Sequence, residues 1–175
     1  YKCFSFVNFY KIDYLFIVKY FLFISFFFVS IICFSEDYIV EFQAKVKNLI
    51  EYNISITKKF RNYDLEGTFT DSFGNIGIFS AVINADVENG KLKKLNAVSE
   101  NIYSNNEKTY SRGVREKSDV DAGIAYNTII GTTDGFNPLI GTKCTTSVRN
   151  LNNQTIGLNK SKLSQDSYTL LNNIN

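Results

Sequence analysis

The chain has 175 residues, with 19 basic and 17 acidic side chains and a net charge of +2. This near balance, without a basic stripe, argues against nucleic acid as a partner. Histidine, tryptophan and methionine are absent, which excludes Ser-His-Asp and Cys-His catalytic arrangements.

An apolar run at residues 20–33 is the first distinctive segment. It follows Lys19 and precedes Ser35, and a positive residue, a short apolar run and a small residue are typical of an export signal. We therefore expect residues 1–35 to be a signal peptide and the protein to be periplasmic or secreted. The alternative is a retained membrane anchor, but the uninterrupted run is shorter than the roughly 20 residues of a spanning helix.

The sequence begins with Tyr1 and contains no methionine. It is either a fragment or a translation whose true start lies further inside. A GUG start codon is read internally as valine, so a start at Val18 would leave residues 1–17 outside the coding region.

Three cysteines are present, and Cys3 and Cys33 lie in or before the predicted signal. Cys144 is then alone in the exported part, where no internal disulfide is available. Its neighbours alternate in polarity, which favours a buried side chain. We predict no metal site and no cofactor, because thiolate and imidazole ligands are lacking.

After residue 36, apolar and polar residues alternate with the period of half-buried β-strands. We expect strands at residues 38–47, 50–57, 63–69, 76–87, 92–103, 108–115, 122–131 and 139–148. The pair Asn89-Gly90 is typical of a type I′ hairpin turn. The tail is rich in Asn, Lys and Ser; we expect a short element near residues 155–158 and a frayed end.

Consecutive strands joined by short turns predict an antiparallel meander. An open sheet would expose its edges, and closure into an up-and-down barrel removes them. We therefore predict an all-β fold, in which an antiparallel barrel of about eight strands at residues 36–150 follows the N-terminal hydrophobic signal helix. Residues 151–175 form a polar tail in this interpretation. A β-sandwich is the alternative.

A turn signature occurs at residues 129–136, which read IIGTTDGF, with Gly141 following. It resembles the GGTGxF…G turn of allene-oxide-cyclase-like and dirigent-like β-barrels. In those families the turn joins two late strands of an eight-stranded barrel, so the resemblance implies the same fold here. It implies no catalytic residue. The chain is also similar to small exported proteins of unknown function from AT-rich marine bacteria.

Ligand contacts are suggested by two arginines on one expected strand. Arg112 and Arg115 lie three residues apart, so they point to opposite strand faces and one can enter the barrel. An inward guanidinium can hold a carboxylate through paired hydrogen bonds. We select Tyr110, Arg112 and Tyr126 as candidate ligand-binding residues, with a surface ion pair as the alternative role for arginine. No catalytic residue is predicted.

The interior is expected to be rich in aromatic side chains, namely Phe42, Tyr52, Phe69 and Tyr126. An eight-stranded barrel holds either a packed interior or one small ligand. We therefore expect a non-enzymatic exported barrel that binds a small apolar or amphipathic ligand. One alternative is a structural or interaction module of the cell envelope with a filled core. Another is an isomerase or cyclase that acts by positioning alone. Membrane contact is expected only through an uncleaved N-terminal segment, and the oligomeric state stays open.

Overall fold

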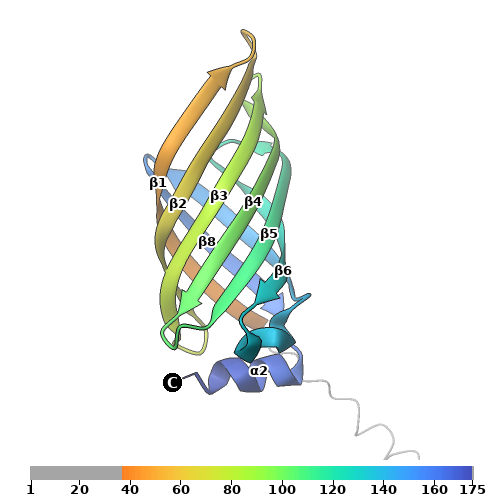
Figure 1. Ribbon diagram of the computed structural model, residues 1–175. Helices are drawn as coiled ribbons and strands as arrows, with labels where there is room; N and C mark the ends of the chain where they lie inside the picture. The colour runs from red at the N-terminus through yellow and green to blue at the C-terminus, as the bar shows by residue number, and fades with distance from the viewer. Residues whose placement is uncertain (1–36, 175) are drawn as a thin grey trace, which may run out of the picture. The chain divides into compact units, whose positions relative to one another are not determined.

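The computed structural model describes residues 37–174. They form a closed barrel of eight antiparallel strands in which each strand pairs with its neighbours in sequence and β8 pairs with β1 (Figure 1). The strands are β1 (Asp37–Asn53), β2 (Lys58–Asp71), β3 (Ile76–Glu88), β4 (Lys91–Tyr103), β5 (Lys108–Asp119), β6 (Ala122–Thr132), β7 (Lys143–Leu151) and β8 (Gln154–Lys162). The predicted closed up-and-down barrel is confirmed. The predicted signal helix lies outside the described residues.

Alternation of side chains places the core inside the barrel. On β1, Val40, Phe42 and Ala44 are buried, whereas Glu41 and Gln43 between them point outward. The same period continues on β2 and β3, because successive residues of a strand face opposite sides of the sheet. The buried side chains of these three strands make up most of the apolar core.

The first two predicted strands are one strand in the structure. β1 runs through Asn48, where the pairing register with β2 shifts between Lys47 and Ile50. Asn48 adopts a φ of 49°, a conformation that asparagine tolerates better than most residues. The expected turn at Asn48 is therefore a bulge, and the chain reverses only at residues 54–57.

The predicted polar tail contributes the strand that closes the barrel. β8 pairs with β7 on one side and with β1 on the other, so the barrel ends at Lys162 rather than at residue 150, and the tail is not frayed. The inward positions of β8 are Thr155, Gly157, Asn159 and Ser161. These residues are small or polar, which removed the apolar alternation that would have revealed the strand.

Gly157 is required by the close approach of an aromatic ring. A Cβ atom at this position would lie 2.1 Å from Cζ of Phe42, well inside van der Waals contact. Phe42 in turn stacks on Phe79, with ring centroids 4.6 Å apart. The absence of a side chain on β8 thus lets the large rings of β1 and β3 fill this part of the interior.

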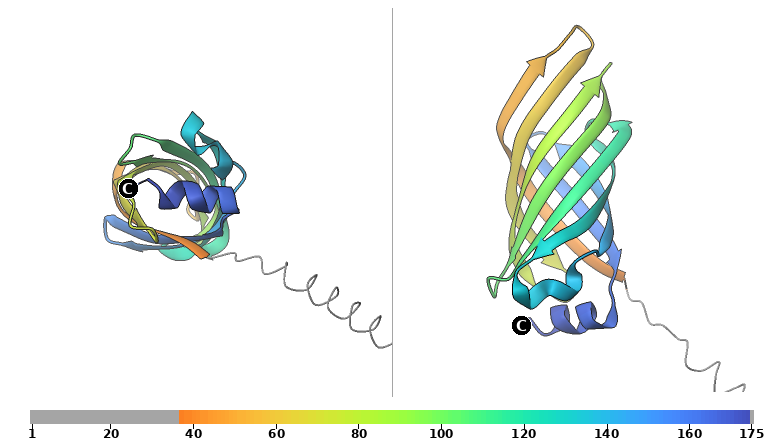
Figure 2. Two further views of the ribbon diagram at one scale, coloured as in Figure 1. Left: turned by 90° about the horizontal axis from the view of Figure 1, so that it is seen from below. Right: turned by 45° about the vertical axis from the view of Figure 1, so that its right-hand side comes forward.

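One end of the barrel is covered by two short helices. The 3₁₀ helix η1 (Asp134–Leu139) lies between β6 and β7, and α2 (Gln165–Asn172) follows β8. Seen from below, α2 lies across the barrel opening (Figure 2). Leu171 is 0 % exposed, and the Ser167 hydroxyl donates to the carbonyl of Pro138 over 2.9 Å. Within residues 37–174, no helix is long and apolar enough to cross a membrane.

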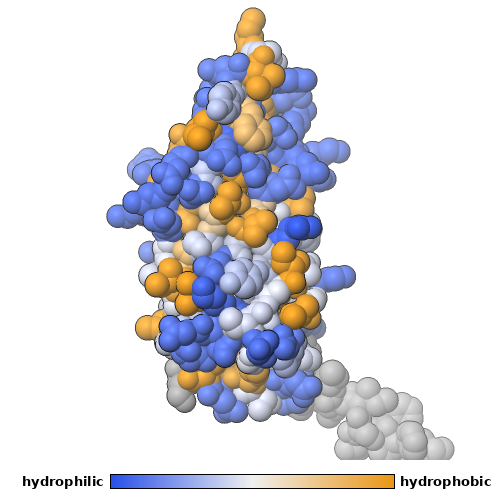
Figure 3. Space-filling view, in the orientation of Figure 1, coloured by the Kyte–Doolittle hydropathy of each residue, from blue (hydrophilic) through white to orange (hydrophobic). Residues whose placement is uncertain are grey.

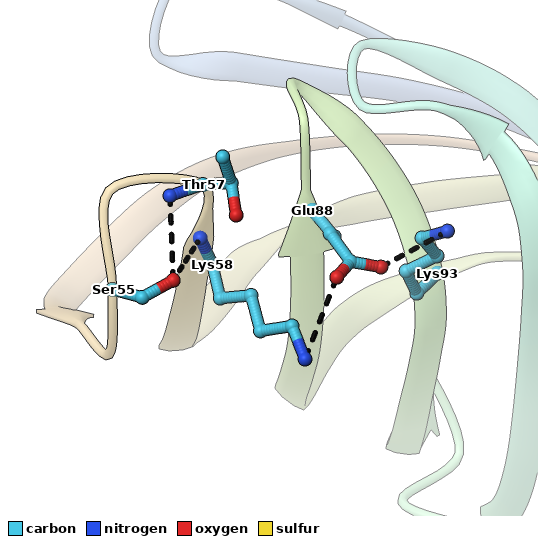
Figure 4. Close-up of polar contacts among 5 residues, drawn as sticks. All are labelled: Ser55, Thr57, Lys58, Glu88 and Lys93. Carbon is cyan, nitrogen blue, oxygen red and sulfur yellow. Dashed lines mark hydrogen bonds and ion pairs between the residues drawn. The ribbon is translucent and has the colours of Figure 1, made fainter.

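On the face seen in Figure 3, charged and apolar side chains are interspersed. The most prominent apolar part of this face is the tip of the β1–β2 hairpin, which projects at the end opposite α2 (Figure 1). Ile54 is 67 % exposed there and Ile56 is fully exposed. The tip is held by local bonds, because the Ser55 hydroxyl oxygen accepts from the backbone N–H of Lys58 over 3.1 Å (Figure 4).

The neighbouring β3–β4 turn has the predicted type I′ character. Asn89 and Gly90 both have positive φ, at 52° and 72°, as this turn type requires. Glu88, just before the turn, forms ion pairs with Lys58 at 3.4 Å and with Lys93 at 3.1 Å (Figure 4). These contacts join the β1–β2 hairpin to the next hairpin at this end of the barrel.

Candidate functional site: a cavity inside the barrel

The barrel encloses a cavity of about 110 Å³. Its lining runs from Leu139 and Leu171 at the end covered by α2 to Arg115 and Asn150 near the opposite end. The cavity is therefore elongated along the barrel. Such concave, enclosed spaces are the usual sites of small ligands.

The wall formed by β1, β2 and β3 is apolar. Its side chains are buried, and they include two stacked aromatic rings. The residues of this apolar wall are Val40, Phe42, Leu65, Phe79, Ala81 and Ile83. A ligand in the cavity would bury hydrophobic surface against this side, which is favourable by about 25 cal/mol per Å².

The opposite wall, formed by β5 to β8, is polar. Most of its cavity-lining residues are polar, among them Thr109, Ser111, Asn127, Cys144, Thr146, Asn159 and Ser161, and the apolar ones are Ala125, Ile129 and Val148. Three of the polar residues are connected: the Asn127 amide donates to the Thr146 hydroxyl, which donates to the side-chain carbonyl of Asn159. Gly113 on β5 makes room for this cluster, because a Cβ there would lie 2.0 Å from Oδ1 of Asn127.

Asn101 brings an unpaired polar atom to the cavity. The side-chain oxygen of Asn101 on β4 is buried and accepts no hydrogen bond from any described residue. Its cross-strand neighbours are Phe79 and Thr109, so it lies where the apolar and polar walls meet. Since buried polar groups are nearly always paired in proteins, this acceptor is available to a ligand or a water molecule.

A buried carboxylate organises the end covered by α2. Asp71 accepts from the Tyr38 hydroxyl, from the Asn75 amide and from the backbone N–H of Phe73, each over 2.9 Å. Asn75 also donates to the carbonyl of Leu171 over 2.9 Å. This network ties α2 to the barrel, although the side-chain oxygen of Asn75 has no hydrogen-bond partner among the described residues.

Two phenols extend the network into the cavity. The hydroxyls of Tyr38 and Tyr103 lie 3.2 Å apart, and burial raises the pKa of both well above the ordinary value of a tyrosine. Because the single proton of Tyr38 goes to Asp71, Tyr103 donates to Tyr38. Both phenols stay neutral at physiological pH, so they act as hydrogen-bonding groups and not as bases.

Cys144 lies on the polar wall and is half-buried. Burial raises the pKa of its thiol, although a hydrogen bond with Ser161 opposes this shift. A reactive cysteine needs a lowered pKa. Its environment therefore suits a packing role better than nucleophilic chemistry.

A second cavity, of about 140 Å³, lies at the end opposite α2. Its lining includes Val87 at the end of β3, and Asp121 and Asn152 from the β5–β6 and β7–β8 connections. We call it the mouth. It shares Tyr63 and Asn150 with the interior cavity, so the two spaces adjoin.

The three predicted ligand-binding residues do not line the interior cavity. Tyr126 is 70 % exposed, Arg112 is exposed, and Tyr110 borders a shallow depression on the outer face. The inward residue of the arginine pair is Arg115, which is 3 % exposed. Binding by Tyr110, Arg112 and Tyr126 stays a prediction, but its premise of an inward Arg112 is wrong.

Two of the four expected interior aromatics are in the core. Phe42 and Phe69 are buried, whereas Tyr52 is 58 % exposed and Tyr126 points outward. Tyr52 lies beyond the bulge of β1, on the hairpin that projects past the barrel. Sequence reasoning missed Asn101, Asn127 and Arg115, since an inward polar residue breaks the hydrophobic pattern that locates a core.

No group of three or more Cys, Asp or Glu side chains among residues 37–174 is placed to hold a metal ion. Comparisons of the chain with family models, with curated proteins and with solved structures found no match. The resemblance of residues 129–136 to the dirigent-like turn stays a prediction. The structure places these residues at the end of β6 and in η1, where Phe136 is buried.

Proposed function

We propose that the protein is a non-enzymatic barrel that binds a small apolar or amphipathic ligand in its interior cavity. The observation that carries this proposal is an enclosed space with an apolar wall on one side and a polar wall on the other. A purely structural barrel gains nothing from the unpaired acceptor of Asn101 beside that space, because an unsatisfied buried polar group costs about 1–3 kcal/mol.

The cavity volume restricts the ligand. About 110 Å³ is below the roughly 300–1,000 Å³ of sites for drug-sized molecules, and an engineered apolar cavity of about 150 Å³ binds benzene. The ligand is therefore slender, such as a single alkyl chain or one small ring. The elongated lining favours the chain.

Native mass spectrometry of the protein purified from its own host tests the proposal first. We expect an additional mass that is released as a small amphipathic molecule under denaturing conditions. Titration with octanol, followed by NMR of residues on both walls, tests it without the natural ligand. An unliganded mass in repeated preparations, together with no octanol-dependent shift at the cavity, would refute the proposal.

A matched pair of variants locates the binding. Ser111 lines the cavity and the adjacent Arg112 is exposed on the outer face of the same strand. We expect Ser111→Leu, which places three more carbon atoms in the cavity, to weaken octanol binding at least about tenfold. Arg112→Leu should leave it unchanged. Equal effects of the two variants would argue against an interior site.

The second candidate is a structural or interaction module of the cell envelope with a nearly filled core. The small cavity volume favours it, as does the projecting hairpin with its exposed Ile54 and Ile56. The octanol titration separates the two functions, since a filled barrel shows no saturable binding.

A further inference from the structure

Arg115 is a buried guanidinium without an ion-pair partner. Its side chain is 3 % exposed, and it belongs to none of the ion pairs formed within residues 37–174. Nη2 donates to the carbonyls of Asp119 and Val120, each over 2.8 Å, whereas Nε has no acceptor. A buried charge without a counter-ion is costly, and proteins normally pair it.

The surroundings of Arg115 combine apolar and polar groups. Leu95 is its cross-strand neighbour on β4, and Gly123 on β6 leaves room for its stem, because a Cβ there would lie 3.2 Å from Cδ of Arg115. Burial lowers the pKa of the guanidinium, with Asp119 and Asp121 acting in the opposite direction from beyond ion-pair distance. An arginine side chain nevertheless stays charged in proteins.

The position of Arg115 suits the head group of a ligand. It lines the interior cavity near the end opposite α2, where the mouth adjoins through Tyr63 and Asn150. The Tyr63 phenol is near enough for the guanidinium to influence its pKa. A chain lying along the apolar wall would thus end at two hydrogen-bond donors, the guanidinium of Arg115 and the hydroxyl of Tyr63.

We propose that Arg115 binds the carboxylate of an amphipathic ligand whose apolar chain occupies the interior cavity. The inference rests on the proposed binding function and names its ligand class, a slender carboxylic acid in its ionised form. A carboxylate accepts a charge-assisted hydrogen bond from a guanidinium, and Nε of Arg115 is a buried donor left without a partner. The incoming anion supplies the direct ion-pair partner that no residue of 37–174 provides to Arg115.

Octanoate and octanol test the proposal, because they share a chain and differ in charge at about pH 7. We expect the wild type to bind octanoate at least about tenfold more tightly than octanol, as for a hydrogen bond to a charged group. Arg115→Met should lose this preference while its octanol affinity changes less than about threefold. Arg149→Met, at an exposed arginine on β7, is the matched control and should behave as the wild type.

The outcomes separate this inference from the proposed function. If both molecules bind equally to the wild type, or if Arg115→Met keeps the preference for octanoate, Arg115 is not the receptor although the barrel binds ligands. If neither molecule binds, the proposed function fails and the inference fails with it.

A measurement on the wild type covers the case in which Arg115→Met does not fold. The Arg115 Nε–H NMR resonance, assigned by its absence in Arg115→Lys, should shift on addition of octanoate and not of octanol. An unmoved resonance at saturating octanoate would overturn the proposal.

Discussion

Truncation of Leu171 tests whether α2 is an integral part of the barrel. Leu171 is 0 % exposed and contributes to the main core cluster from outside the strands. Leu171→Ala removes about three carbon atoms, worth about 0.8 kcal/mol each when buried, and leaves a cavity that the surrounding strands can only partly fill. The expected loss in the free energy of unfolding is therefore about 3 kcal/mol, within the usual range for such changes.

Thermal and chemical unfolding both measure this loss. For a domain of this size, about 1 kcal/mol corresponds to roughly 3 °C in Tm, so we expect Leu171→Ala to lower Tm by about 10 °C. Asn172→Ala, at the exposed neighbouring position, is the control and should change Tm by less than about 2 °C. A similar small change in both variants would show that α2 does not pack on the barrel in solution.

Three further changes follow from the interior. Gly157→Ala should destabilise the barrel by about 1–3 kcal/mol, because the new Cβ clashes with Phe42. Adding Phe42→Leu to the same chain should reduce this cost. If urea unfolding shows that the two variants lower the free energy of unfolding additively, there is no clash. Above about pH 10 the unfolded chain loses phenol protons that buried Tyr38 and Tyr103 retain in the folded state, so the free energy of unfolding should fall with rising pH. This alkaline loss should be weaker in Tyr38→Phe, and equal slopes for both proteins would refute it. Asn101→Leu removes an unpaired buried acceptor and should raise the free energy of unfolding by about 1 kcal/mol while weakening octanol binding, whereas a loss of stability would show that the oxygen is paired in solution.

The barrel fold could be predicted because most strands alternate strongly. β3 is an example, where Phe79, Ala81 and Ile83 point inward between outward Ser80 and Val82. The β1 bulge could not be predicted, since Asn48 is equally compatible with a hairpin turn and with a positive-φ bulge. The prediction divided β1 into two strands and expected only a short element near residues 155–158 where β8 lies, so the predicted number of strands is still correct.

The site was predicted less well, and β5 explains why. Its inward positions are Thr109, Ser111, Gly113 and Arg115, while Tyr110 and Val114 lie on the other face. If the inward positions are assumed to be apolar, this strand is predicted to face the opposite way. That assumption selected Arg112 over Arg115, because a shift of one residue exchanges the two faces of a strand.

The polar wall is also the strongest argument that the interior does more than stabilise the fold. Hydrophobic residues at these positions would fill the cavity and avoid the cost of burying amides and a guanidinium. The Asn127–Thr146–Asn159 cluster offsets part of that cost by pairing within itself. Asn101 and Arg115 do not, and both unpaired atoms belong to side chains that line the same space. An acceptor toward the end covered by α2 and a cation near the mouth are the groups that an elongated amphipathic ligand would use.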